Sequence, residues 1–178
     1  INHGKDELRY CDPRRFGEFR IISAPINRDD TPQALAHLGP EPFTDAFNTE
    51  QFFRQSRKKK TNVKGFLMDA KNVCGVGNIY ASEALFRAGI HPMRAAGRIA
   101  ERRFPALVAS IREVLAEAIE AGGTTLKDFV GGDGRPGYFQ QELFVYGREG
   151  LPCLQCKSPI KNRVLGQRAS YYCSGCQR

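Results

Sequence analysis

Apolar side chains recur every three or four residues along much of the chain, and this spacing predicts amphipathic helices. The clearest case begins near residue 103 and ends at residue 121, where Gly122 and Gly123 follow. Its regularly spaced apolar positions are Leu107, Ile111, Leu115 and Ile119. Residues spaced in this way share one face of a helix, so all four are expected in the core.

Shorter helices are predicted over residues 48–57 and 64–71. Another helix is predicted to begin at Asn78, because asparagine is a favoured N-cap residue. Gly75 and Gly77 stand just before it, and their missing side chains would let a phosphate approach the free amides of the first turn. A tight corner between two helices, without any ligand, explains the same pattern equally well.

Near the start of the chain the pattern changes to that of strands. Residues 8–11 and 16–22 predict a β-hairpin around a turn that contains Asp12, Pro13 and Arg14. A lone two-stranded hairpin is only marginally stable in water. We therefore expect that Ile1 lies inside a longer natural chain, whose remaining strands are not in this sequence.

The charge of the chain narrows the choice of partner. Its 178 residues carry a formal net charge of +8, which favours a polyanion such as nucleic acid. Between residues 54 and 71, seven Lys or Arg residues accompany one acid, Asp69, as on a surface that faces phosphates. No apolar run approaches the roughly 20 residues that span a bilayer, so no membrane partner is expected.

Two CxxC pairs near the end of the chain predict a metal site. Sixteen residues separate the pairs, and this spacing is typical of a tetrahedral zinc site. Four thiolates leave no open position on the ion, so the predicted zinc is structural. Two disulfides in a secreted protein are the weaker alternative. The predicted ligands are Cys153, Cys156, Cys173 and Cys176.

Alternating residues between the two cysteine pairs predict a second hairpin, with strands at 160–164 and 168–172 and Arg168 near the tip. Before the zinc module, residues 131–137 contain four glycines and no apolar anchor. Such a loop is typical of a lid over a site, and a plain surface linker is an equally good interpretation.

Taken together, these segments resemble the formamidopyrimidine-DNA glycosylase family of bacterial base-excision repair enzymes. The resemblance extends over essentially the whole chain and rests on collinear motifs. Besides the four cysteines, the motifs are residues 12–17 (DPRRFG), 67–69 (LMD), 75–80 (GVGNIY), 123–129 (GTTLKDF) and 133–139 (DGRPGYF).

The resemblance implies a mainly α fold in three parts. Residues 1–30 would be a residual β-hairpin from a truncated N-terminal β-sandwich that carries catalysis in the family. Residues 31–145 would form a helix–two-turn–helix DNA-binding domain, and residues 146–178 a four-cysteine β-hairpin zinc finger with one structural Zn²⁺.

The resemblance also implies roles for single residues. Arg14 would fill the space of an extruded nucleotide, and Phe16 would wedge between base steps. The implied contacts to the DNA backbone are Lys64, Gly77, Asn78, Tyr146 and Arg168. The implied loop over the flipped lesion base contains Thr124, Thr125, Lys127 and Tyr138.

Catalysis in the family uses the amine of an N-terminal proline, followed by a glutamate. This sequence begins Ile1-Asn2-His3 and carries no such start, so the chain is expected to bind DNA without excising a base. The implied partner is double-stranded DNA with an oxidised purine or an abasic site, bound by a monomer in the bacterial cytoplasm at the nucleoid.

Three alternatives stay open at this point. The sister branch of the family prefers oxidised pyrimidines, although residues 133–139 favour the purine branch. A non-catalytic module of helix–two-turn–helix and zinc ribbon would fit the missing nucleophile. A zinc ribbon that binds protein would show little salt dependence in DNA binding, whereas a phosphate-binding surface would show a steep one.

Overall fold

The computed structural model describes residues 10, 19, 35–121 and 143–178. The chain divides into two compact units, Ile1–Ala36 and His37–Arg178. Of the first unit, the structure describes the rings of Tyr10 and Phe19, whose centroids lie 6.1 Å apart. The rest of the predicted N-terminal hairpin, with Arg14 and Phe16, lies outside the described residues.

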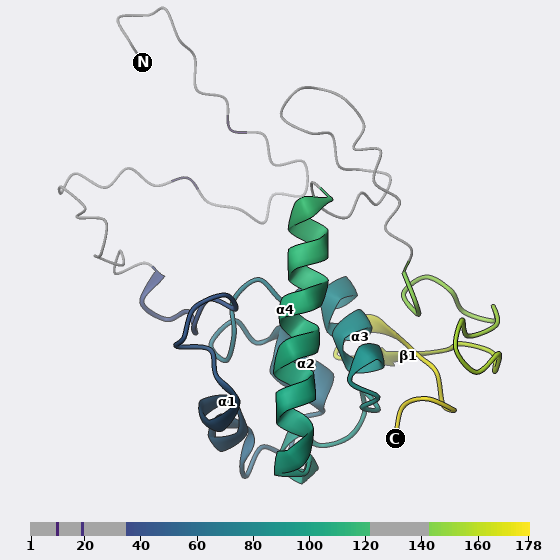
Figure 1. The fold of residues 1–178 in the computed structure, drawn as a ribbon, viewed down its shortest axis with the longest axis horizontal. Helices are drawn as coiled ribbons and strands as arrows, with labels where there is room; N and C mark the ends of the chain where they lie inside the picture. The colour runs from purple at the N-terminus through teal and green to yellow at the C-terminus, as the bar shows by residue number, and fades with distance from the viewer. Residues whose placement is uncertain (1–9, 11–18, 20–34, 122–142) are drawn as a thin grey trace, which may run out of the picture. The chain divides into compact units, whose positions relative to one another are not determined.

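The second unit is built from helices and one two-stranded sheet (Figure 1). Its elements are the helices α1 (Thr49–Ser56), α2 (Val63–Met68), α3 (Asn78–Arg87) and α4 (Phe104–Glu120), the 3-10 turns η3 (Ala96–Arg98) and η4 (Glu101–Arg103), and the strands β1 (Lys161–Leu165) and β2 (Arg168–Tyr172).

Asparagine side chains fix the starts of the first two helices. Asn48 accepts a hydrogen bond from the amide of Gln51 at 2.9 Å, and Asn62 accepts one from the amide of Gly65 at 2.7 Å. Each bond satisfies an amide that has no partner within its own helix. The start of α1 therefore lies within one residue of the predicted position.

Phenylalanine rings form the centre of the helical core, between α1, α2 and α4. Phe52 of α1 lies 4.9 Å from Phe47, 5.0 Å from Phe66 and 6.0 Å from Phe104, measured between ring centroids. All four side chains are fully buried. On the other side of the core, α3 packs along α4 (Figure 1).

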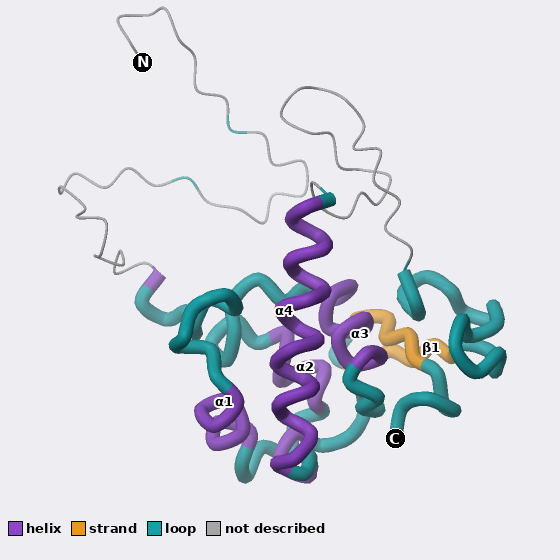
Figure 2. The backbone as a smooth tube through the Cα atoms, in the orientation of Figure 1, coloured by secondary structure: helices purple, strands orange, loops and turns teal. Residues whose placement is uncertain are grey.

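The two strands form the predicted antiparallel hairpin, in which Leu165 pairs with Arg168 (Figure 2). Between them, Gly166 and Gln167 both have positive φ, 54° and 65°. Two successive residues in this conformation are typical of the type I′ turn, whose twist matches that of the strands. Arg168 consequently stands at the tip of the hairpin.

Three expectations from the sequence need correction. Ile119 is 68% exposed, because positions four residues apart drift by about 40° per step around a helix. The buried face of α4 passes instead through Val114 and Ala118. The N-cap of α3 is Gly77, and Asn78 is the first helical residue. Helix α2 ends at Met68, before the expected residue 71.

Among the described residues, no helix is both long enough and apolar enough to cross a membrane.

Candidate nucleic-acid interface and metal centre

Asn78 and Tyr146 are brought together although they lie far apart in the sequence. The Nδ2 group of Asn78 donates a hydrogen bond of 3.2 Å to the hydroxyl of Tyr146. The ring of Tyr146 in turn packs edge-to-face on Tyr171 of β2, with centroids 4.9 Å apart. Gly77, just before Asn78, is exposed, and a Cβ at that position would meet nothing within 4 Å. The start of α3 is therefore open to an approaching ligand.

Lys64 joins the same region from α2. Its Nζ donates to the carbonyl oxygen of Ala169 and to Oγ of Ser170, each at 2.8 Å, and only 1% of the residue is exposed. Burial, and next the charge of Arg168, lower the pKa of Lys64 to about 8. The predicted contact of Lys64 with a phosphate stays a prediction, because in this structure its ammonium group binds the hairpin.

Arg168 itself is exposed, and in the described part of the chain no carboxylate pairs with it. A free guanidinium has five N–H donors in a planar fork, which matches the oxygens of a phosphate. All five predicted backbone-contact residues thus lie in one connected region, in which Asn78 and Tyr146 are linked to Arg168 through Tyr171 and β2.

Glu83 of α3 holds the segment that carries Tyr146. One carboxylate oxygen accepts the amides of Val145 at 3.0 Å and Tyr146 at 2.8 Å, and the other accepts the amide of Phe144 at 2.8 Å. Glu83 is only 2% exposed. A buried carboxylate oxygen needs hydrogen-bond donors, and here each amide N–H takes the place of a water molecule.

Sequence reasoning missed Glu83, although one feature pointed to it. It is the single acid in the stretch Ala81–Phe86, whose other members are small or apolar and all of which are buried. A charge at the centre of a buried helix face needs a specific partner. Gln177 was missed as well: it accepts from the amide of Cys173 at 2.8 Å and donates to the carbonyl of Ile90 at 2.9 Å.

The four cysteines form one cluster, with all sulfur atoms within 4.8 Å of one another. The pairs Cys153–Cys176 and Cys156–Cys173 lie 3.9 and 3.3 Å apart. Ligands on 2.3 Å bonds to a tetrahedral ion stand about 3.8 Å apart, so the cluster fits a metal ion of this kind. Gly175 permits the arrangement, since a Cβ there would lie 3.0 Å from Sγ of Cys156.

The environment of the thiols differs around the cluster. Hydrogen bonds from Ser158 lower the pKa of Cys156 to about 6, whereas burial raises the pKa of Cys176 to about 12 and that of Cys173 above its usual range. Four thiolates so close together repel one another unless a cation balances their charge.

The predicted lesion loop, with Thr124, Thr125, Lys127 and Tyr138, lies outside the described residues, as do Arg14 and Phe16.

Comparison with known proteins agrees with these features. The family model of the "Formamidopyrimidine-DNA glycosylase H2TH domain" matches residues 38–130. The formamidopyrimidine-DNA glycosylase of Syntrophotalea carbinolica is 57% identical over 171 residues, which make up 96% of this chain and 62% of that protein. The chain therefore spans less than two thirds of the length of this curated relative.

Two solved structures share the fold. The MutM (Fpg) protein of Thermus thermophilus superimposes with a TM-score of 0.74 and 47% identity, covering 79% of this chain and 54% of that one. The Lactococcus lactis Fpg, in a complex with DNA that contains an abasic site, gives a TM-score of 0.73 and 32% identity, covering 80% of this chain and 52% of that one.

The three bonds to Glu83 predict a large effect of Glu83→Gln. Glutamine has one acceptor oxygen, and its NH2 group would face an amide N–H, so the free energy of unfolding should fall by about 2–3 kcal/mol. Urea unfolding followed by tyrosine fluorescence measures this, because the chain has no tryptophan and Tyr146 lies at the contact. The matched control is Glu117→Gln. The side chain of Glu117 is half-exposed and pairs with Arg87, so this substitution should lower the free energy of unfolding by under about 1 kcal/mol. Equal losses in both variants would contradict the role of Glu83.

The lowered pKa of Lys64 predicts a pH dependence of stability. The pKa is about 8 in the folded chain and near 10.5 in the unfolded chain, so between these values the unfolded state binds more protons. The free energy of unfolding should therefore rise through this group by about 2 kcal/mol from pH 8 to pH 10. Lys64→Met should lack this rise, while titration of the cysteines is common to both proteins. Parallel pH profiles for the two proteins would rule out the effect.

Proposed function

Because the chain belongs to the formamidopyrimidine-DNA glycosylase family, we propose that it is the DNA-binding part of a glycosylase for oxidised purines. The whole enzyme would remove 8-oxoguanine and formamidopyrimidines and then cut the strand by β,δ-elimination. The observation that carries the proposal is the connected surface of Asn78, Tyr146 and Arg168, in which the Asn78–Tyr146 bond of 3.2 Å joins α3 to the cysteine-bearing hairpin module.

Each part of this surface suits a phosphate backbone. The first turn of α3 has no side-chain cap, so its amides can donate to an anion. Arg168 supplies a charge without a carboxylate partner in the described part of the chain. Lys64, buried under β2, holds the strand that presents Arg168. Contacts of this kind fix position and register on the duplex and do not depend on its sequence.

Recognition of the lesion would come from residues outside the described part. In this proposal Arg14 and Phe16 enter the duplex after the damaged nucleotide leaves it, and Thr124, Thr125, Lys127 and Tyr138 cover the flipped base. An apolar wedge and a base-sized side chain offset part of the cost of unstacking. The family's amine nucleophile has no counterpart in these 178 residues. In this proposal the 178-residue chain therefore binds DNA and does not excise a base.

The metal in the cysteine cluster would be Zn²⁺. Four sulfur ligands suit zinc, and they leave no position for water or substrate. The ion would supply rigidity to the finger, because among the described residues the finger contributes only Cys153, Ile160 and Cys173 to the buried apolar cluster. The other members of that cluster are Val145 and Phe86 of α3.

The DNA-binding proposal predicts that the 178-residue chain binds an 8-oxoguanine:cytosine duplex with a steep salt dependence. Arg168→Gln should weaken binding several-fold and reduce the slope of log K against log salt by about 0.9, the value for one neutralised phosphate. Arg87→Gln is the control, since it removes the same charge at a residue that pairs with Glu117 and lies outside the proposed surface. Fluorescence anisotropy measures the affinity and its salt dependence for both variants.

Identical slopes in the two variants would remove Arg168 from the interface. In a separate experiment, a covalent adduct trapped with borohydride would show that the chain retains lyase chemistry.

The zinc proposal predicts one zinc ion per chain by elemental analysis of the purified protein. Removing it with a chelator should loosen the hairpin and weaken duplex binding at least tenfold, and added Zn²⁺ should restore it. Cys173→Ser should behave like the chelated protein, whereas Cys74→Ser, at a buried thiol outside the cluster, should keep its zinc. A chain that folds and binds DNA equally well without metal would overturn the proposal.

A further inference from the structure

A basic concavity lies at the ends of α3 and β2 that are opposite to Asn78 and Arg168. Helix α3 begins at Asn78 and runs about 15 Å to its other end, after which Gly89 accepts the amide of Arg178 at 3.0 Å. Strand β2 begins at Arg168 and ends about 13 Å away at Tyr172. The ring of Tyr172 packs on His91 at 4.6 Å. The concavity therefore begins at the far ends of α3 and β2. Lys64 lies between the concavity and Arg168, with its amide bonded to the carbonyl of Pro92 and its ammonium group to that of Ala169.

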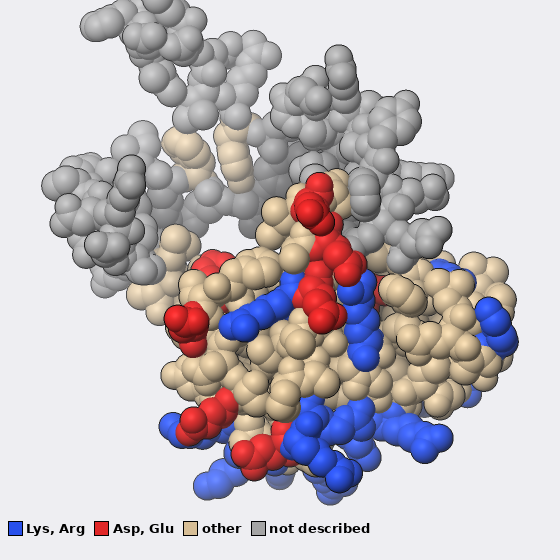
Figure 3. Space-filling model, in the orientation of Figure 1, with Lys and Arg blue, Asp and Glu red and all other residues tan. Residues whose placement is uncertain are grey.

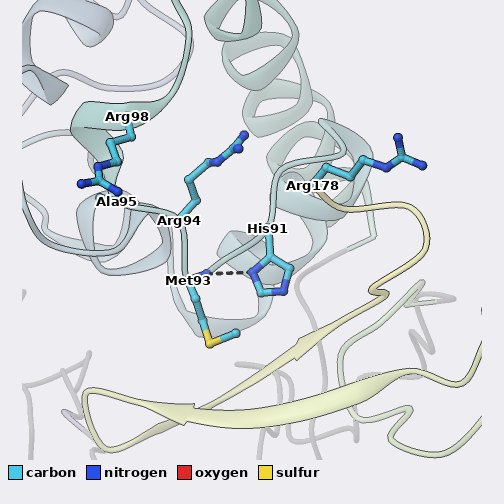
Figure 4. A pocket seen from close by; sticks show the side chains of 6 residues that line it. All are labelled: His91, Met93, Arg94, Ala95, Arg98 and Arg178. Carbon is cyan, nitrogen blue, oxygen red and sulfur yellow. Dashed lines mark hydrogen bonds between the residues drawn. The ribbon is translucent and has the colours of Figure 1, made fainter.

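We call this concavity the basic groove. It has a volume of ≈ 790 Å³ (Figure 4). Its lining residues are His91, Met93, Arg94, Ala95, Arg98 and Arg178. In Figure 4 the side chains of the three arginines extend from the backbone in different directions.

Backbone contacts hold the lysine run of residues 58–60 beside the groove. The amide of Ala96 donates to the carbonyl of Thr61 at 2.9 Å, and that of Gly97 donates to the carbonyl of Lys59 at 3.1 Å. A Cβ on Gly97 would lie 2.9 Å from the same Lys59 oxygen, so only glycine permits this approach. Two basic segments more than thirty residues apart thus form one surface.

Fold stability does not explain these charges. Lys58 adopts a φ of 63°, which disfavours any side chain with a Cβ. In the described part of the chain, no carboxylate pairs with Arg94 or Arg98. Arg102 stands just before α4, where a positive charge opposes the helix dipole. Arg103 is the exception, because its guanidinium donates to the carbonyl of Ala88 at 2.9 Å. Figure 3 shows Lys and Arg gathered at that end of α4 and acidic residues toward its other end.

Positive charges in and around the groove act on His91, which is the one histidine among its lining residues. Burial lowers the pKa of His91, and the charges of Arg94, Arg163 and Lys161 lower it further. Nδ1 of His91 accepts a weak bond from the amide of Met93 at 3.4 Å. The surface therefore favours an anionic ligand that brings several negative charges at once.

We propose that the basic groove binds the phosphate backbone of a second DNA segment, so that a chain bound through Asn78 and Arg168 can pass directly to another duplex. The inference rests on the proposed function. Guanidinium forks match phosphate oxygens, and a regular backbone can meet Arg94, Arg98 and the lysine run together. An acidic protein segment would be expected to add an apolar anchor, and Met93 is the only large apolar side chain among the lining residues.

Competition kinetics test direct transfer. The chain is loaded with a fluorescent 8-oxoguanine duplex and chased with rising concentrations of unlabelled duplex. The observed release rate should rise with competitor for the native chain, since two duplexes can be bound at once. Arg94→Gln/Arg98→Gln should reduce this rise at least fivefold, while affinity for a single short duplex stays within twofold. Arg87→Gln, which removes one positive charge at a residue paired with Glu117 and outside both surfaces, should behave as native. A native rate independent of competitor, or an equal rise in the double variant, would overturn the proposal.

A second measurement separates this proposal from the proposed function. In an Asn78→Ala/Arg168→Gln background, residual low-salt binding of an undamaged duplex should fall at least fivefold when Arg94→Gln/Arg98→Gln is added. No fall would overturn the groove as a DNA site. If Asn78→Ala/Arg168→Gln leaves binding of the lesion duplex at the native level, the proposed function fails. The effect of adding Arg94→Gln/Arg98→Gln still tests the groove in that case. A poly-glutamate peptide could also displace the duplex from the Asn78→Ala/Arg168→Gln variant. If it did so at a lower concentration than competing DNA, the groove would be assigned to an acidic protein and the proposal would be overturned.

Discussion

The contact of one carboxylate with three successive amides determines where the hairpin module lies on the helices. Glu83 projects from the middle of α3, and the amides of Phe144, Val145 and Tyr146 converge on its two oxygens. The bonds fix both the position and the direction of the chain that enters the module. Every residue of the candidate interface beyond α3 depends on this direction, because Tyr146 is one of the three donors and Arg168 follows through the hairpin.

Two further buried polar side chains complete the connection, and each uses neutral partners. Lys64 donates to a carbonyl and a hydroxyl of β2, and Gln177 bridges Cys173 and the carbonyl of Ile90. Neutral dipoles compensate a buried charge less completely than an opposite charge would, so the positions of these groups must be accurate. The apolar contact at this junction centres on Phe86 of α3, which is buried among Val145 and Ile160 and stacks on Phe144 at 5.5 Å. The polar bonds add direction to this apolar contact between the helical core and the module.

Much of this arrangement could be predicted from local patterns. The 3.6-residue period of α4 and the alternation around Gly166 are properties of neighbouring residues, so they fix elements to within a few positions. The expected cap Asn78 was wrong by one residue, because Gly77 holds the cap position. The metal site could also be predicted, because two CxxC pairs at this spacing are enough to bring four sulfur atoms together. Ile119 was misplaced, since a count in steps of four ignores the slow rotation of the apolar stripe. The roles of Glu83, Lys64 and Gln177 could not be derived, because each bonds to a partner 61 to 106 residues away in the chain and only the tertiary fold brings them together.

Gly97 has a consequence for how the protein could be altered. Its backbone contact with Lys59 fixes the course of two segments, and among the charged side chains Arg57 adds bonds to the carbonyls of Ala96 and Ile99. Apart from Arg57, scaffold and surface charge are thus separable at this place, so the other basic positions can be exchanged while the main chain keeps its path. The same feature makes this part of the molecule a site for grafting, where a different recognition surface could be installed on an unchanged helical core.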